Sequence, residues 1–291
     1  MIEQALYQHL QEQDSLRPWL AEYAGKMAIF NQSAPADNDP DWGEGPKYGR
    51  IVFTVDLQGE PDRILGGKLT LDILCKEDEQ FPEEIEPLIR PLIHGYFFCN
   101  RKFVVSAQWK NTSPFTEPSN RLTGCTVFFD LLAFPVISTS TPDLISRFNA
   151  WTAEFPNLLV INHDALPTAA WKPTGQQSAV YWRVAAEAPA GWIPDTYQTI
   201  WRTAIVKGHI FSETPAEATN VARDLTIRLH AVKRLLKPGE APIMVNRKNT
   251  TDNSADPLRT GQVTVEATYG IIVAFEPDPE QVGVINHINY T

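Results

Sequence analysis

The sequence predicts an α+β protein of two similar domains, each a mostly antiparallel sheet of four or more strands with one long covering helix and a long β-hairpin. Three observations lead to this expectation. The chain has 291 residues, which is enough for two domains of ordinary size. A polar stretch at residues 110–124, KNTSPFTEPSNRLTG, returns at residues 248–261 as KNTTDNSADPLRTG. The helices and strands predicted around the two stretches follow one another in the same order.

The two stretches belong to a longer correspondence along the chain. Its matched positions are Pro35 with Pro167, Pro82 with Pro215, Lys110 with Lys248 and Phe134 with Phe275, which are 132, 133, 138 and 141 residues apart. A slow increase in separation is what small insertions in loops would produce. We therefore expect an internal duplication into domains of residues 1–137 and 141–291, joined near PVISTSTPD. The alternative is a pair of unrelated α+β domains with chance similarities.

The first domain is expected to begin with a helix and to end with a hairpin. Its expected elements are a helix in IEQALYQHLQ, strands in RIVFTVDL and KLTLDILC, a helix from Pro82, and strands in KFVVSAQW and CTVFFDLLAFPV. The second helix has apolar side chains at helical spacing, at Ile85, Leu88, Ile89, Leu92, Ile93 and Tyr96. Residues 110–124 are expected to form the hairpin loop, which is too long for a tight turn and therefore needs a surface to pack against.

The second domain is expected to repeat this order. Its expected elements are a helix in PDLISRFNAWTAEF, strands in AVYWRVAAE and IWRTAIVKGHIF, a long helix from Thr214, and strands in APIMVNR and QVTVEATYGIIVAFEP. Thr214, Pro215 and Glu217 form a helix start with an N-cap, a first-turn proline and a capping-box acid. The apolar stripe of this helix is Ala218, Val221, Ala222, Leu225, Leu229, Val232 and Leu236, and the helix is expected to stop at Lys237-Pro238-Gly239.

Composition and charge exclude several classes of protein. The net charge of −10 disfavours broad wrapping of nucleic acid, and it also disfavours docking to an anionic membrane. No segment reaches the length of about 18 apolar residues that a membrane span needs, and MIEQALYQHLQEQD lacks the pattern of a signal peptide. Cys75, Cys99 and Cys125 lack CxxC spacing and are expected to be reduced, buried thiols.

A search for catalytic and metal-binding motifs finds none that is complete. The chain has no phosphate-binding or dinucleotide-binding glycine motif, no HExxH and no paired CxxC. The histidines are scattered singly, and His94 and His230 are expected in helices without a metal or catalytic role. Asp37, Asp39 and Asp41 resemble the start of a calcium loop, but the glycine is one position late and the twelfth position is not glutamate. We expect a solvated loop there, no cofactor, no metal and no enzymatic activity.

The order of elements resembles the tail-completion or tail-terminator family of tailed bacteriophages, which includes head-to-tail joining proteins. The resemblance is clearest in residues 1–137: MIEQALYQHL, AIFNQSAP, the proline-rich PDWGEGPKYG, RIVFTVDL, KLTLDILC, the helix from Pro82 and the final VFFDLLAF. Most proteins of this family resemble one half of the chain, so the duplication is a departure. The alternatives are another neck or tail structural protein built on the same unit, or a cytosolic α+β enzyme or ligand-binding protein.

The resemblance implies a structural virion protein that is assembled in the cytoplasm of the bacterial host. It would form a ring that caps the tail tube and joins it to the head connector, and DNA would pass through without sequence-specific binding. Its expected partners are other copies of itself, the tail-tube protein and the connector. The expected contact residues in the two loops are Lys110, Asn111, Thr112, Arg121, Lys248, Asn249, Thr250 and Arg259.

Charge also differs between the two domains. Residues 1–140 have a net charge of −8 and residues 141–291 have a net charge of −2. A cluster of acids surrounds a predicted helix start, where acids favour the helix N-terminus through its dipole; the alternative is an acidic face toward the DNA channel or a basic partner. It consists of Glu77, Asp78, Glu79, Glu83 and Glu84. Because ring closure requires repeated identical contacts, two domains this different favour six copies of the chain over three copies that supply six equivalent domains.

Overall fold

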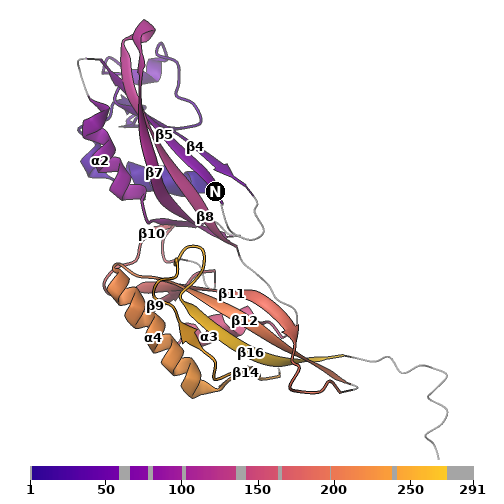
Figure 1. Ribbon diagram of the computed structural model, residues 1–291. Coiled ribbons are helices and arrows are strands. Elements are labelled where there is room, and N and C mark those ends of the chain that lie inside the picture. The colour runs from indigo at the N-terminus through magenta and orange to yellow at the C-terminus, as the bar shows by residue number, and fades with distance from the viewer. Residues whose placement is uncertain are drawn as a thin grey trace, which may run out of the picture.

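The computed structural model describes residues 2–58, 66–77, 81–99, 103–135, 142–162, 166–196, 198–237 and 241–273. These residues form an α+β fold with two large, mostly antiparallel sheets, as the sequence predicts (Figure 1). The helices are α1 (Ile2–Gln11), α2 (Pro82–Ile93), α3 (Leu144–Thr152) and α4 (Pro215–Val232), with 3-10 turns η1 (Asp14–Leu16), η2 (Pro40–Trp42) and η3 (Pro118–Asn120).

The strands divide between the two large sheets, apart from a small pair. The first sheet contains β3 (Ile29–Asn31), β4 (Arg50–Leu57), β5 (Gly67–Lys76), β6 (Phe97–Cys99), β7 (Phe103–Glu117), β8 (Leu122–Pro135) and β10 (Ala170–Trp171). The second contains β9 (Leu158–Val160), β11 (Ser178–Pro189), β12 (Thr199–Phe211), β13 (Arg234–Leu235), β14 (Ile243–Val245), β15 (Thr250–Thr251) and β16 (Val263–Ile272). The small pair is β1 (Glu22–Tyr23) with β2 (Lys26–Met27).

The two large sheets have the same strand order in their described parts. The first reads β6-β7-β8-β5-β4-β3 and the second reads β13-β14-β16-β12-β11-β9. In each, a three-residue strand pairs in parallel with the first strand of a long hairpin, β3 with β4 and β9 with β11, and the other pairings are antiparallel. A helix follows each hairpin, α2 after β5 and α4 after β12. Strand β10 extends the first sheet beyond β6 and has no counterpart on β13.

The predicted helix starts are confirmed, and two predicted helix ends are wrong: α2 ends at Ile93, so His94 and Tyr96 lie beyond it, and α4 also ends early. Helix α4 has both hydrogen bonds of a capping box, because Glu217 N donates to Thr214 Oγ1 and Thr214 N donates to Glu217. Asp143 caps α3 by accepting from Ser146 N at 3.0 Å. Helix α4 ends at Val232, because Lys233 has a left-handed φ of 59° and the next two residues pair as β13 with β14. Leu235 is therefore buried, and Leu236 is 76% exposed.

Each domain buries one face of its sheet under its helices. Helix α1, η1 and α2 cover the first sheet, where Ile85, Ile89 and Ile93 of α2 are fully buried. In the second domain α3 and α4 cover the sheet, and Leu225 and Leu229 are buried there. Figure 1 shows α2 and α4 lying along their respective sheets. Fully burying a large aliphatic side chain contributes roughly 1.5–3 kcal/mol, so these two cores are the main source of stability.

The two domains meet through the outer faces of their sheets. Phe97 and Phe134 of the first domain pack against Phe211 of the second, with ring centroids 5.0 Å and 5.3 Å from it. Tyr181 donates a hydrogen bond to the carbonyl of Pro135 at 2.9 Å. Trp171 pairs with Phe97 where β10 joins β6. An apolar cluster and a strand pairing therefore join the two domains.

Candidate functional site

The predicted loop at residues 110–124 is mostly strand in the structure. Strand β7 continues to Glu117, and only Pro118–Arg121 form the turn. Phe115 pairs with Gly124, where a side chain would lie 2.4 Å from the Phe115 ring, so this glycine makes room for the aromatic side chain. The expectation of a long loop was wrong because threonine and phenylalanine favour a strand and every residue from 111 to 117 has a partner on β8.

The predicted contact residues of this hairpin are tied to its own domain. Lys110 pairs with Asp130 at 3.2 Å, and Arg121 lies 3.7 Å from Glu77. Thr112 donates to Glu86 at 3.0 Å, which attaches the hairpin to α2. Asn111 is exposed. In Figure 1 the hairpin extends away from the second domain, so its turn is at one end of the molecule.

The stretch at residues 248–261 is largely a loop, as predicted. Thr250 of β15 pairs with Thr264 of β16. Lys248 is exposed, whereas both side-chain amide atoms of Asn249 are buried without a hydrogen-bond partner. Arg259 lies 3.7 Å from Asp256. Because Leu258 packs against the interdomain cluster, this loop lies at the junction between the domains. The two predicted contact stretches are therefore not brought together.

A buried histidine holds this second loop on the sheet. His209 is fully buried, and its Nδ1 lies 2.7 Å from the carbonyl oxygen of Pro257. Arg183 Nε donates to His209 Nε2 at 3.1 Å, and Arg183 also donates to the carbonyl of Arg259 at 3.5 Å. A carbonyl can only accept, so the geometry requires a neutral imidazole with its proton on Nδ1. No local pattern in the sequence indicates this arrangement, because the histidine appeared as an isolated residue.

The acidic residues near the start of α2 are exposed where the structure describes them. Glu77, Glu83 and Glu84 are exposed, whereas Asp78 and Glu79 lie outside the described residues. Glu83 and Glu84 are in the first turn of α2, where the helix dipole favours negative charge. Burial, together with the nearby negative charges of Glu83 and Glu84, raises the pKa of the Cys75 thiol to about 11.

In the stretch that resembles the start of a calcium loop, Asp37 and Asp39 accept hydrogen bonds from other groups of the protein. Asp37 accepts from Arg50 at 2.9 Å and from the hydroxyl of Tyr48, and Asp39 caps η2 by accepting from Asp41 N at 3.0 Å. The hydrogen bond from Tyr48 holds the pKa of Asp37 below its usual value, with a further contribution from Arg50. Within the part of the chain that the structure describes, no cluster of three possible metal ligands occurs. The expectation of a solvated loop therefore needs refinement: this loop is anchored to the start of β4.

The histidines in and near the helices also have local roles. His94 follows the last residue of α2, and its Nδ1 accepts from Trp109 N at 3.1 Å. Burial lowers the pKa of His94, and Lys172 and Arg90 lower it further through their positive charges. His230 is exposed in the last turn of α4.

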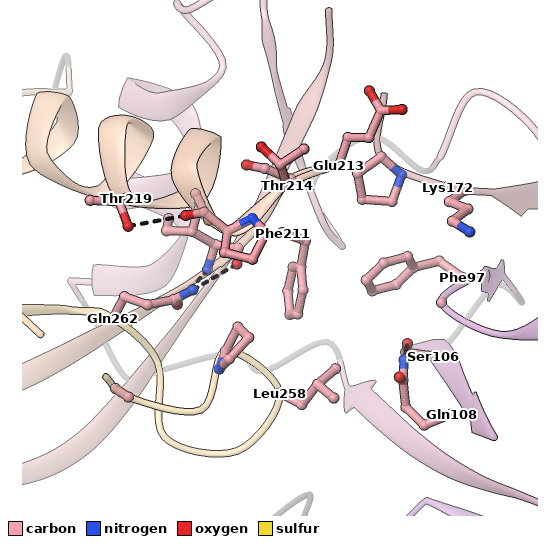
Figure 2. A pocket seen from close by; sticks show the side chains of 18 of the residues that line it. Phe97, Ser106, Gln108, Lys172, Phe211, Glu213, Thr214, Thr219, Leu258 and Gln262 are labelled. Carbon is pink, nitrogen blue, oxygen red and sulfur yellow. Dashed lines mark hydrogen bonds between the residues drawn. The ribbon is translucent and has the colours of Figure 1, made fainter. Parts of the chain in front are cut away.

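A pocket of 480 Å³ lies between the two domains. Figure 2 shows the rings of Phe97 and Phe211, which pack edge to face, in its lining, with Leu258 nearby. Lys172 and Glu213 contribute charged side chains to its lining. Sequence reasoning missed this pocket because its walls come from segments that are far apart in the chain and meet only when the domains pack.

Comparison of the chain with family models, with curated proteins and with solved structures found no match. No helix among the described residues is long and apolar enough to cross a membrane.

Proposed function

We propose that the chain arose by internal duplication and is a structural protein of a tailed bacteriophage or a phage-like particle. It caps the tail tube as a ring and joins the tube to the head connector. The observation that carries this proposal is the shared strand order of the two large sheets, including the parallel pairing of β3 with β4 and of β9 with β11. Two unrelated domains would have little reason to share six strand positions and two helix positions. The repeated unit has the element order that resembles the tail-terminator family.

The shape of the first domain supports a role in assembly. Strands β7 and β8 form a hairpin that extends beyond β6 and away from the second domain (Figure 1). The β7 side of its outer half, from Asn111 to Glu117, lacks a strand partner within the described residues. An unpaired strand edge is a ready surface for another chain. We assign this hairpin to contacts with the tail tube or with a neighbouring copy.

The contact between the domains favours six copies over three. A ring of three chains needs each domain to contact the next in the same way. Within the chain, the second domain contributes β10 to the first, with Trp171 paired to Phe97. Strand β10 lies in the connection from β9 to β11. The corresponding connection in the first domain, from β3 to β4, contains Trp42, which is buried against Tyr23 and Phe30 of its own domain. The first domain therefore offers no equivalent strand to a following second domain, and the contact cannot simply be repeated around a ring.

The acidic residues of the first domain are assigned to the channel that DNA passes through. Glu77, Glu83 and Glu84 are exposed on the first domain, and this domain has the larger negative charge. An acidic wall repels phosphate groups and lets a duplex slide. Under this proposal the protein is located in the neck or tail of the virion.

Native mass spectrometry of the assembled protein tests the proposal. Six copies of the 32.7 kDa chain give about 196 kDa and three give about 98 kDa. A hexamer that binds purified tail tubes is the expected result. A protein that stays monomeric beside its tail tubes would exclude the terminator function, and a species near 98 kDa would exclude the six-copy ring.

A second candidate function, binding of a small ligand, is favoured by the interdomain pocket. Ligand pockets commonly have volumes of about 300–1,000 Å³, an apolar lining and a few polar groups, and they often occur between domains. The pocket here has this size and combines Phe97, Phe211 and Leu258 with Lys172 and Glu213. Thermal-shift screening of a metabolite library against the chain and a Phe211→Ser variant tests it. A stabilising ligand that the variant does not bind would favour this function.

A further inference from the structure

Two histidines of the first domain lie beside the strand pairing that joins the two domains. Strand β10 pairs with β6, which places Ala170 opposite Phe98. The centroid of the His9 ring, on α1, lies 5.9 Å from that of Phe98 and 4.5 Å from that of Tyr96. His94 is the residue directly after α2 and lies two positions before Tyr96. Both histidines are therefore next to the turn that leads from α2 into β6.

The side-chain hydrogen bond of His94 requires a neutral ring. Nδ1 of His94 accepts from Trp109 N at 3.1 Å, and a backbone N–H can only donate, so the proton of the ring is on Nε2. A second proton would occupy Nδ1 and face the Trp109 N–H, which removes the hydrogen bond. Protonation of His94 therefore breaks a contact between the end of α2 and β7.

Two cations lie near His94, one from each domain. Arg90 precedes it on α2, and the guanidinium of Arg90 lies over the Trp109 ring, 4.9 Å from its centroid. Lys172 directly follows β10; its Nζ donates to the carbonyl of His94 at 3.4 Å and lies 5.5 Å from the centroid of the Tyr96 ring. Burial, together with the positive charges of Lys172 and Arg90, lowers the pKa of His94. A charge on His94 would therefore repel the lysine that connects the second domain to this turn.

The position of His9 also favours a neutral ring. Nε2 of His9 donates to the carbonyl of Leu92 at 2.8 Å, because a carbonyl can only accept. Burial lowers the pKa of His9, and the hydrogen bond to Leu92 and the charge of Glu12 offset only part of this effect. Protonation would place a charge in a half-buried site against β6, the strand that pairs with β10.

The other charged groups on the surrounding elements do not neutralise this effect. On α2 and β7 they form ion pairs, Glu86 with Arg90 at 3.7 Å and Lys110 with Asp130 of β8 at 3.2 Å. From the second domain, Glu213 lines the same pocket as His94, and its carboxylate lies beside Gly175 of its own domain. With these acids present, the pKa of His94 is still below its usual value.

We propose that His94 and His9 form an acid-sensitive switch that controls how firmly the second domain is held on the first. In the neutral state, Trp109 N binds His94, and Lys172 and β10 stay on the turn after α2. In acid, both rings gain a proton, the hydrogen bond to Trp109 is lost, Lys172 is repelled and β10 separates from β6. The cores of the two domains are separate and stay folded. The switch is independent of the ring proposed above, because all its groups belong to one chain.

The direction of the pH dependence follows from the lowered pKa of each histidine. Such a group stabilises the folded contact fully above its unfolded pKa of about 6.5, and this contribution is lost as the pH falls from that value to the lower folded pKa. Unperturbed carboxyl groups titrate near about 4, so a change between about pH 7.5 and pH 5.5 is assigned to histidine.

Hydrogen exchange of the full chain at two pH values tests this switch. Cys99 N donates to the carbonyl of Ala169 at 3.0 Å beside the β6–β10 pairing, so peptides that contain these residues report on it. After correction for intrinsic exchange rates, their protection is expected to fall by about threefold or more between about pH 7.5 and pH 5.5. Peptides from β5 and β12, within the two cores, should keep their protection. Unchanged protection at the pairing, or an equal loss in both cores, would overturn the proposal.

A double variant separates the charge of the histidines from their hydrogen bonds. His94→Asn keeps an oxygen acceptor near the position of Nδ1, and His9→Gln keeps an amide donor near the position of Nε2, but neither side chain gains a proton. The double variant is expected to have the same protection at both pH values. His230→Gln is the matched control, because His230 is exposed in the last turn of α4 and should leave the pH dependence unchanged. A double variant that still loses protection in acid would overturn the proposal.

A variant of the lysine tests whether charge carries the effect. Lys172→Met removes the cation and keeps an apolar stem where Lys172 Cε lies 3.5 Å from the position that a side chain on Gly95 would take. In an NMR titration of the imidazole signals, the pKa of His94 is expected to rise toward about 6.5 in this variant. A His94 pKa that is unchanged by the substitution, or that is already at its usual value in the unaltered chain, would overturn the proposal.

Discussion

In each domain a connection joins the short parallel strand to the first strand of the hairpin, β3 to β4 and β9 to β11. The first connection packs on its own domain, whereas the second packs on the neighbouring domain. In the first domain the connection contains Trp42, which packs with Tyr23 and Phe30 at ring distances of 5.0 Å and 5.7 Å. In the second domain it contains Trp171, which reaches the other domain and packs 5.7 Å from Phe97. The strand order is shared, whereas the connections decide whether a domain covers itself or docks on its neighbour. Connections tolerate such changes because they contribute few of the hydrogen bonds that hold a sheet together.

The comparison also explains the position of the long loop in the second domain. Gly261 has a φ of 80°, and a side chain there would lie 3.1 Å from the His209 ring. Because glycine adopts this conformation without a steric cost, the loop can turn back and place Leu258 in the interdomain cluster. The corresponding stretch of the first domain, residues 110–124, lies mostly in the paired strands β7 and β8. The second domain is therefore the one adapted to make the contact between domains.

Truncating the side chain of Trp171 should reduce the stability of the contact between the two domains more than any other substitution below. Trp171→Ala is expected to weaken the junction by about 3–5 kcal/mol, the usual range for truncating a buried aromatic residue. Each domain keeps its own core, so calorimetry should resolve two unfolding transitions, whereas the unaltered chain is expected to show one. Trp42→Ala is the matched control, and it should lower the transition of the first domain without separating the domains. A single cooperative transition in Trp171→Ala would show that β10 does not hold the domains together.

The structure shows which signals in the sequence were sufficient. Helix starts were predicted well, since a capping box such as Thr214 with Glu217 is a local device that needs nothing else in the fold. Leucine and valine patterns also placed the strands of both hairpins. The end of α4 was missed, because Lys233 leaves the helix to let Leu235 pair with Ile243, which is a non-local contact. Local propensity yields to such tertiary pairing.

The features most relevant to a site were not predictable from local patterns. The pairing of Trp171 with Phe97 joins segments 74 residues apart, and no pattern in either segment indicates the other. The predicted hairpin loop was read from polar residues and Pro114, but a proline is compatible with an edge strand. The predicted match of Phe134 with Phe275 stays a prediction, because Phe275 lies outside the described residues.

The hydrogen bond between the domains should have a smaller effect than the aromatic cluster. Tyr181→Phe removes the donor to the Pro135 carbonyl and keeps the ring against Phe134, 5.2 Å from it. The expected loss is about 0.5–1.5 kcal/mol. Urea unfolding monitored by circular dichroism measures it, with Tyr7→Phe as a control for removal of a tyrosine hydroxyl away from the junction. A loss as large as that of Trp171→Ala would mean that the hydroxyl, rather than the apolar cluster, dominates the contact.

The cap of α4 tests how far the stability of the second domain depends on the local hydrogen bonds between Thr214 and Glu217. Thr214→Ala removes the acceptor for Glu217 N and should destabilise the second domain by about 1 kcal/mol. Thr214→Ser keeps a hydroxyl and should restore most of the stability. In a Trp171→Ala background, where the domains unfold separately, calorimetry should place the shift in one transition only. A shift in both transitions would contradict the separation of the two cores.

The smallest expected effect is the pH dependence of the connection in the first domain. The hydrogen bonds and charge at Asp37 hold its pKa below the value in the unfolded chain. A carboxyl group with a lowered pKa contributes stability above its unfolded pKa of about 4, and loses that contribution as the pH falls through the folded pKa. The free energy of unfolding of Asp37→Asn should therefore lie below that of the unaltered chain near pH 7, with the difference closing under acid conditions. The effect is small because the side chain of Asp37 is 48% exposed and its pair with Arg50 is screened by solvent. Urea titrations from about pH 2 to pH 7 span the relevant range. A difference that stays constant with pH would show that Asp37 acts through its shape and hydrogen bonds alone, and that its charge does not help to hold Trp42 within the first domain.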